Sequence, residues 1–300
     1  MNFRRLDFLI AMTLLAAAPA SGQTAAPALP DFTGVWAHPF LGFEQPLSGP
    51  GPVRNLSRLP SGASNGAQLV GDYNNPILKP EAAALIKKRG EISLSGLAFP
   101  DPDNQCLQQP VPYIFWNFHV QILQSKDKVT IIYPHDNDFR QVRLNSSHPA
   151  MVIPSPHGDS VGHYEGDTLV IDTIGVKVGP HTTLDRLGTP YTEAIHVVER
   201  YRLLDYGAAK AAMDRAEKEW PRVGAYGTDP NYRGKGLQLE FTVEDPGVFT
   251  MPWKATVSYM RAQSLEWQER ICAENVEHYN GTQYYSDKDA RIPTAEKPDF

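Results

Sequence analysis

The sequence predicts a mainly β protein whose antiparallel strands close into a barrel, with a long N-terminal loop and one or two small helices. Three observations lead to this fold class. About eight apolar stretches have the length and composition of strands, and most are joined by short turns. Residues 237–244 alternate apolar and polar side chains with a clear period of two. Closure into a barrel removes the exposed strand edges that such a set of strands would otherwise leave.

The N-terminus, residues 1–22, is predicted to be a signal peptide. Two arginines precede an apolar run over residues 8–18, and small residues follow at a cleavage site near Gly22/Gln23. This pattern predicts a periplasmic or secreted protein. No later stretch is apolar for long enough to span a membrane as a helix. The formal charge of −6 argues against nucleic acid and anionic membranes as partners.

A single domain is predicted for residues 23–300. Residues 38–80 are rich in Gly, Pro, Ser and Asn and read as a long ordered loop. A short helix is expected over residues 80–89, with proline at its start, an acid early and bases late. Residues 207–220 are strongly helix-forming and are expected to be a helical insert that packs outside the barrel or over its mouth.

From residue 116 onward, apolar and polar residues alternate in a succession of strands. They are predicted over residues 116–123, 128–133, 139–144, 168–173, 194–204, 237–244, 253–260 and 265–272.

Two cysteines, Cys106 and Cys272, are present in the chain. In an oxidising compartment the widely separated pair is predicted to form a disulfide, which would stabilise the fold by up to ~5 kcal/mol in the chain-entropy model. Two buried free thiols are the alternative.

Two resemblances extend this interpretation. Gly34-Val-Trp36, at the first predicted strand, resembles the Gly-x-Trp signature of lipocalins and related calycin barrels, which implies a barrel that holds a small ligand. Residues 162–173, 197–200 and 243–246 with Pro252-Trp253 are similar to an uncharacterised family of exported bacterial proteins with a GDTLVIDT…VVER…EDP…PW pattern. That resemblance implies export and a shared β fold, and it implies no reaction. The family often has Arg and Trp where this chain has His163 and Tyr164.

The densest group of ionisable residues lies in residues 157–173. His157, Asp159, His163 and Glu165 are predicted to supply proton transfer, because histidine titrates near neutrality and carboxylates can be tuned toward it. Gly158-Asp-Ser160-Val-Gly162 matches a nucleophile elbow, but the helix that an elbow needs is not predicted to follow.

A metal is the alternative use of the same residues. His157, Asp159 and His163 could bind zinc or iron, with His148 or His181 completing the ligand set. No other cofactor is predicted.

Substrate-binding residues are predicted to line the barrel. On residues 194–204, His196 and Arg200 share one face, while Glu199 and Tyr201 share the other, so either choice of inner face buries a charge that needs a partner. A structural Glu–Arg pair is one interpretation, and a ligand-binding cluster is the other. In the second interpretation the substrate-binding residues are His119, Tyr164, His196, Arg200 and Trp253.

The sequence therefore predicts an exported enzyme that acts on a small hydrophobic or aromatic molecule by acid–base chemistry, of lyase, isomerase or hydrolase type. A periplasmic ligand-binding protein without turnover and a His/Asp metalloenzyme are the alternatives. The sequence specifies no oligomeric state.

Overall fold

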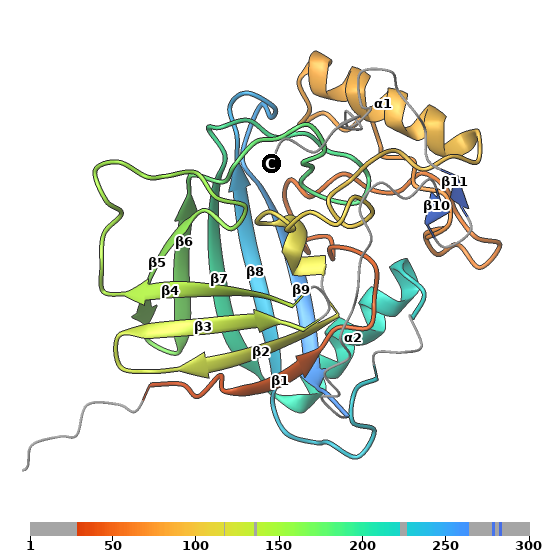
Figure 1. Cartoon of the computed structure of the whole chain (residues 1–300). Coiled ribbons are helices and arrows are strands. Elements are labelled where there is room, and N and C mark those ends of the chain that lie inside the picture. The colour runs from red at the N-terminus through yellow and green to blue at the C-terminus, as the bar shows by residue number, and fades with distance from the viewer. Residues whose placement is uncertain are drawn as a thin grey trace, which may run out of the picture.

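A closed barrel forms the centre of the protein (Figure 1). The computed structural model describes residues 29–116, 118–134, 137–222, 227–263, 278–279 and 282–283. The barrel strands are β1 (Gly34–Ala37), β2 (His119–Gln124), β3 (Lys128–Tyr133), β4 (Asp138–Leu144), β5 (Asp159–Glu165), β6 (Thr168–Ile174), β7 (His196–Leu204), β8 (Gly236–Glu244) and β9 (Trp253–Arg261). Closure occurs at β1, which pairs with both β2 and β9. The short strands β10 (His278–Tyr279) and β11 (Thr282–Gln283) pair separately.

The predicted barrel of mainly antiparallel strands is confirmed, and one pair of strands departs from that pattern. β4 and β5 pair in parallel, with Arg143 opposite Val161 and Leu144 opposite Gly162. The segment between these strands, residues 145–158, is long enough to carry the chain back along the barrel before β5 begins, whereas a tight turn would force an antiparallel pair. The predicted strand over residues 265–272, the signal peptide and Cys272 lie outside the described residues.

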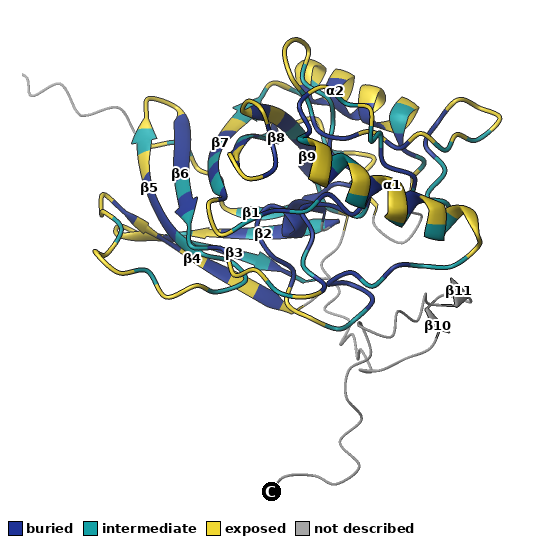
Figure 2. Cartoon of the chain, turned by 90° about the horizontal axis from the view of Figure 1, so that it is seen from above, coloured by how far each residue is buried: buried dark blue, intermediate teal, exposed yellow. Residues whose placement is uncertain are grey.

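Most barrel strands alternate buried and more exposed residues, as the colours of Figure 2 show, and their buried apolar side chains fill much of the barrel. Phe241 of β8 lies among three other rings, with centroid distances of 5.0 Å to Phe43, 5.1 Å to Phe115 and 6.0 Å to Trp253. Edge-to-face contacts of this kind add to the free energy of burying the rings. These aromatic residues form one continuous core with the inner residues of the strands.

An arginine covers the Gly34-Val-Trp36 signature. The Arg261 guanidinium of β9 lies 4.2 Å from the Trp36 ring, a cation–π contact. Gly34 has a positive φ of 138°, and a Cβ there would collide with the same guanidinium. The glycine therefore allows both the backbone conformation and the approach of Arg261.

Two helices pack around the barrel. α1 (Pro80–Leu94) begins at Pro80 as predicted and continues five residues beyond the predicted end. α2 (Tyr206–Glu219) confirms the helical insert and contacts the outside of β8 and β9, burying Ala209, Ala212, Met213 and Ala216. Residues 38–79 form the predicted long loop, which contains only isolated bridges. Within the described residues, no helix combines the length and the apolar character that a membrane crossing requires.

Candidate functional site

The alternation of β7 decides which of its two faces points into the barrel. Glu199 and Tyr201 are 0 % and 2 % exposed, whereas Arg200 has a side chain that is 42 % exposed. Val197, Glu199 and Tyr201 therefore face inward, and His196 and Arg200 face outward. The prediction that His196 and Arg200 line the barrel interior is wrong, because the inner face carries the larger apolar residues together with Glu199.

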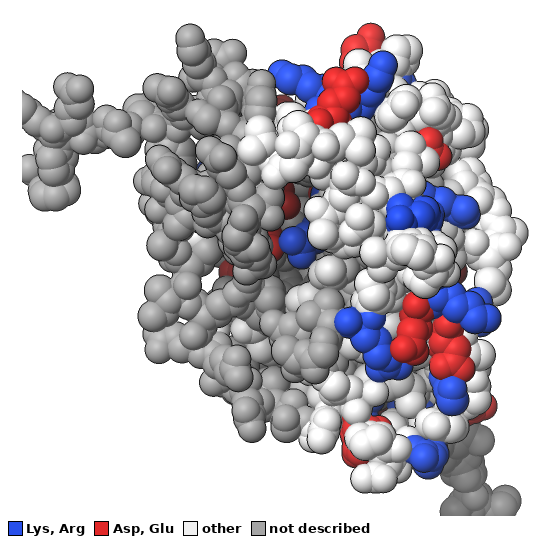
Figure 3. Space-filling model, turned by 90° about the vertical axis from the view of Figure 1, so that its right-hand side faces the viewer, with Lys and Arg blue, Asp and Glu red and all other residues white. Residues whose placement is uncertain are grey.

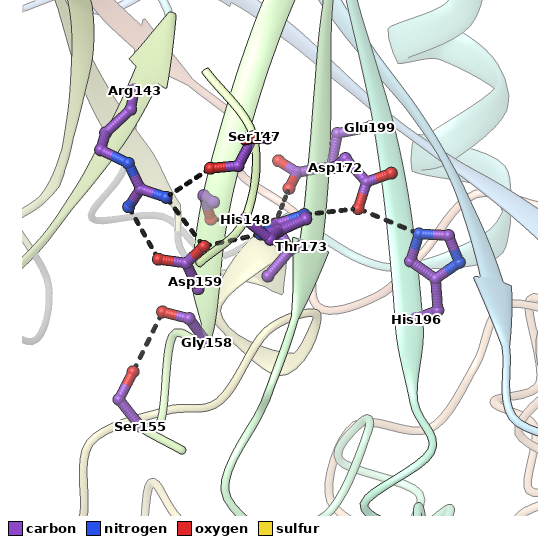
Figure 4. A network of polar contacts seen from close by, with 11 residues as sticks. Arg143, Ser147, His148, Ser155, Gly158, Asp159, Asp172, Thr173, His196 and Glu199 are labelled. Atoms are coloured by element: carbon purple, nitrogen blue, oxygen red, sulfur yellow. Dashed lines mark hydrogen bonds and ion pairs between the residues drawn. The ribbon is translucent and has the colours of Figure 1, made fainter. Parts of the chain in front are cut away.

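An outer network of ion pairs accounts for much of the dense ionisable segment (Figure 4). Arg143 contacts both carboxylate oxygens of Asp159, at 2.7 and 2.9 Å. His148 bridges two carboxylates, with Nδ1 2.6 Å from Asp159 and Nε2 3.1 Å from Asp172. His196 joins the same Asp172 at 3.0 Å. Because His148 belongs to the segment between β4 and β5, the network fixes that crossover against β5, β6 and β7.

A second outer cluster contains the other predicted proton-transfer residues. His163 lies 3.1 Å from Glu165, which accepts a hydrogen bond of 2.7 Å from Arg200. All three side chains are about half exposed. Arg200 and His163 hold the pKa of Glu165 below its usual value, and Arg143 does the same for Asp159. A proton-transfer group works best with a pKa near the working pH, so neither carboxylate is suited to that role.

The barrel interior contains a buried Glu–Arg pair, as in the structural interpretation of residues 194–204, but the sequence did not identify the arginine. Arg140 of β4 donates to both oxygens of Glu199, at 2.7 and 2.5 Å, and the two side chains are 2 % and 0 % exposed. Tyr201 donates to the same carboxylate at 3.1 Å, and Thr173 lies 3.4 Å from it. β4 and β7 are not neighbours in the sheet, so the pair crosses the barrel. The Phe115 ring lies 5.5 Å from the guanidinium.

This polar region continues from Arg140 toward the beginning of β4. Asp138 shares the inward face of that strand with Arg140, and Tyr133 lies directly opposite Asp138 in the β3–β4 register. His157 Nε2 lies 3.6 Å from Asp138 Oδ2, and Gln108 donates to Oδ1 of the same carboxylate at 3.1 Å. We name Tyr133, Asp138, Arg140, His157, Glu199 and Tyr201 the interior polar cluster.

Three buried polar atoms of the interior polar cluster make no hydrogen bond of ordinary geometry to a described residue: Tyr133 Oη, Arg140 Nε and His157 Nε2. The Tyr133 hydroxyl lies near the Arg140 guanidinium, and His157 Nε2 has the 3.6 Å contact with Asp138. Trp253 Nε1, elsewhere in the core, is also buried without a hydrogen bond to a described residue. Each such atom costs about 1–3 kcal/mol of stability, and folded proteins keep few of them. Burial raises the pKa of Tyr133 to about 12, so its hydroxyl is a proton-bearing donor at neutral pH.

The other predicted binding residues are dispersed. Trp253 faces the interior and is 1 % exposed. Tyr164 accepts a hydrogen bond of 2.7 Å from Gln124 and does not join the interior polar cluster. His119 faces outward from β2 and is half-buried, and this burial lowers its pKa.

The predicted metal ligands do not converge. His157 contacts Asp138, Asp159 contacts Arg143 and His148, and His163 contacts Glu165. His181 is buried elsewhere, where burial and the charge of Arg89 lower its pKa. In the part of the chain that the structure describes, no group of three or more His, Cys, Asp or Glu residues is arranged to hold a metal ion.

Two signals in the sequence point toward the missed residues. On residues 194–204 either choice of inner face buries a charge. When the face with Glu199 lies inside, its carboxylate needs a partner of opposite charge. On β4, Asp138, Arg140, Val142 and Leu144 share a face, but the exposed Phe139 on the opposite face makes the pattern ambiguous. Searches of family models, of curated proteins and of solved structures find no match to this chain.

Proposed function

We propose that the protein is an exported enzyme that binds a small organic molecule at the interior polar cluster and moves a proton to or from it. The supporting observation is the set of buried polar atoms in the interior polar cluster that make no hydrogen bond of ordinary geometry to a described residue. Arg140 Nε can only donate a hydrogen bond, and the Tyr133 hydroxyl can donate as well. A guest with a carbonyl or carboxylate oxygen would accept these hydrogen bonds. The aromatic rings of Phe115, Phe241 and Trp253 favour an apolar or aromatic body for that guest.

The residues of the interior polar cluster have distinct proposed roles. Glu199 occupies both terminal nitrogens of Arg140, which leaves the Nε–H to stabilise negative charge on a substrate oxygen. His157 transfers the proton, and Asp138 orients its imidazole. Breaking a C–H bond beside a carbonyl fits this arrangement: the proton passes to His157, and the electron pair moves onto the oxygen that faces Arg140 and Tyr133. This chemistry belongs to isomerases and lyases.

Two tyrosine substitutions test the binding site. Tyr133→Phe removes a hydroxyl that makes no hydrogen bond of ordinary geometry to a described residue, so it should leave the free energy of unfolding unchanged or raise it by about 1 kcal/mol. The same change should weaken binding of benzoate, measured by quenching of tryptophan fluorescence. Tyr201→Phe is the matched control, because it removes a hydroxyl that Glu199 accepts and should lower stability by about 1–3 kcal/mol. If both changes destabilise the protein equally, the Tyr133 hydroxyl forms a hydrogen bond within the protein, and this would contradict its proposed role as a free donor for a ligand.

Deuterium exchange separates an enzyme from a carrier. We expect the protein to accelerate exchange of the methyl protons of acetophenone in D₂O, followed by NMR. His157→Ala should abolish that acceleration and retain benzoate binding. Binding without exchange in the unmodified protein would favour a ligand carrier. If neither probe binds, the interior polar cluster is not a ligand site.

Export and the disulfide between Cys106 and Cys272 belong to the same proposal. Expression with the native N-terminus in a Gram-negative host should yield a periplasmic protein that begins near Gln23. Reduction should increase its intact mass by two hydrogens, and only the reduced, unfolded protein should react with a thiol reagent. A cytoplasmic product that retains residues 1–22 would refute export. Thiols that react without prior reduction would refute the disulfide.

A further inference from the structure

A pocket of about 460 Å³ lies on the outer face of the barrel wall, between α2 and residues 44–54 of the N-terminal loop. Glu240 of β8 and Lys254 of β9 line it, whereas their neighbours Phe241 and Ala255 face the core. The pocket therefore lies outside the barrel wall, whereas the interior polar cluster lies inside the barrel. Its volume is in the range of small-molecule sites.

A carboxyl group with unusual surroundings lines this pocket. Glu44 is held against β9, because one oxygen accepts the Ser258 N–H at 2.7 Å and the other accepts the Ser258 hydroxyl at 3.0 Å. The Glu44 backbone also forms a bridge with Thr256, which fixes its position. Burial raises the pKa of Glu44 to about 7, against the effect of the Ser258 hydrogen bonds and the charge of Arg215.

Some of the other charged side chains of the pocket form ion pairs, and others do not. Lys254 lies 3.4 Å from Glu240, and Glu219 contacts Arg58 at 2.8 Å. Arg54 and Arg215 contact no carboxylate within ion-pair distance among the described residues, although both line the pocket. On the side of the molecule that carries α1 and α2, some basic side chains lie next to acidic ones and others stand apart (Figure 3). Arg54 and Arg215 therefore give the pocket two guanidinium groups without a carboxylate partner among the described residues.

We infer that this pocket is a second binding site, for a small organic anion that bears carboxylate or phosphate groups, and that Glu44 takes up a proton when the anion binds. Arg54 and Arg215 would contact the anion, since guanidinium groups pair well with planar or multi-oxygen anions. A negative ligand favours the neutral form of a nearby carboxyl group.

The charged groups around Glu44 determine how the affinity for an anion depends on pH. The charged and titratable groups that share the pocket come from four elements: Arg202 of β7, Glu240 of β8, Lys254 of β9, Arg215 and Glu219 of α2, with Arg54 from the loop. Protonation of Glu44 leaves this set more positive. Affinity for an anion should therefore rise as the pH falls from 8 to 6.

Calorimetric titration with fumarate and with dimethyl phosphate, whose charges do not change between pH 6 and 8, tests the inference. We expect at least one of the two anions to bind, with proton uptake seen as a dependence on buffer ionisation enthalpy. Affinity should increase between pH 8 and pH 6 by roughly tenfold for each unit by which the anion raises the pKa of Glu44. Arg215→Gln should weaken binding at least about tenfold, as expected for a charge-assisted hydrogen bond. Lys218→Gln, the same change in charge on the exposed side of α2, should not.

Glu44→Gln provides the decisive variant, because glutamine mimics the neutral acid. It should bind the anion with an affinity that no longer depends on pH between 6 and 8. Binding by neither anion, or pH dependence that survives in Glu44→Gln, would overturn the inference. Tyr133→Phe should leave anion binding unchanged, so failure here is distinguishable from failure at the interior polar cluster.

Stability gives a readout of Glu44 that needs no ligand. Because the pKa of Glu44 is raised in the folded protein, the folded state holds more protons than the unfolded state between about pH 4.5 and 7. Stability contributed by Glu44 therefore decreases as the pH rises through that window. Glu44→Gln should be more stable than the unmodified protein at pH 8 and similar to it at pH 4. The buried Asp101 and His38, whose pKa values are about 6 and about 4, titrate alike in both proteins and cancel in the difference.

Discussion

Replacing Glu199 by leucine is expected to lower the free energy of unfolding by about 3–5 kcal/mol, because Arg140 would remain as a buried cation without a counterion. Arg140 donates two short hydrogen bonds to the Glu199 carboxylate inside the barrel, where both side chains are almost fully buried. Urea denaturation at pH 7 measures the change. Arg200→Met is the matched control: it breaks a half-exposed ion pair from the same strand and should cost no more than about 1 kcal/mol.

The double substitution Arg140→Met and Glu199→Leu should recover much of the lost stability. Removing both charges eliminates the desolvation cost of the pair, and apolar side chains of similar size are compatible with the surrounding core. The double-mutant cycle should therefore show strong coupling between the two positions. If the effects of the two single substitutions on the free energy of unfolding simply add in the double variant, Arg140 and Glu199 are not energetically coupled, which would contradict the buried ion pair. Recovery of stability without recovery of benzoate binding would show that the pair is retained for function.

Phe241→Ala should have a similarly large effect, lowering the free energy of unfolding by about 3–5 kcal/mol. The ring is fully buried and contacts Phe43, Phe115 and Trp253, so its removal leaves a cavity where the N-terminal loop, the β2 entrance and β9 meet. Chemical denaturation followed by far-UV circular dichroism measures the loss.

Phe139→Ala is the control for this prediction. Phe139 is the same residue type on another barrel strand, but it is 62 % exposed and should change stability by less than about 0.5 kcal/mol. Comparable losses in the two variants would contradict the assignment of inner and outer faces on β4 and β8.

Much of the fold was predictable because the barrel strands bury alternate residues. The two-residue period identified β3, β7, β8 and β9 nearly to their ends, and composition identified both helices. The parallel pairing of β4 with β5 was not predictable in this way. Residues 145–158 have no regular periodicity, and the direction of β5 depends on how that segment crosses the barrel.

The site was harder to predict, because periodicity groups residues by face without saying which face is inside. On β7 the same period gives one set with His196 and Arg200 and another with Glu199 and Tyr201, and each contains charge. Only the position of Arg140, across the barrel on β4, decides between them. Of the predicted site residues, His157 is a member of the interior polar cluster, and Trp253 packs against Phe241 in the core. Glu44 was missed because its properties arise from packing against Ser258, which is distant in the chain.

A crystal structure of the protein soaked with benzoate tests the central claim most directly. We expect the carboxylate within hydrogen-bond distance of Arg140 Nε and Tyr133 Oη, with the ring against Phe115 or Trp253. Density absent from the barrel at saturating benzoate, with those two atoms hydrogen-bonded to other protein groups, would contradict the proposal that the interior polar cluster holds a ligand.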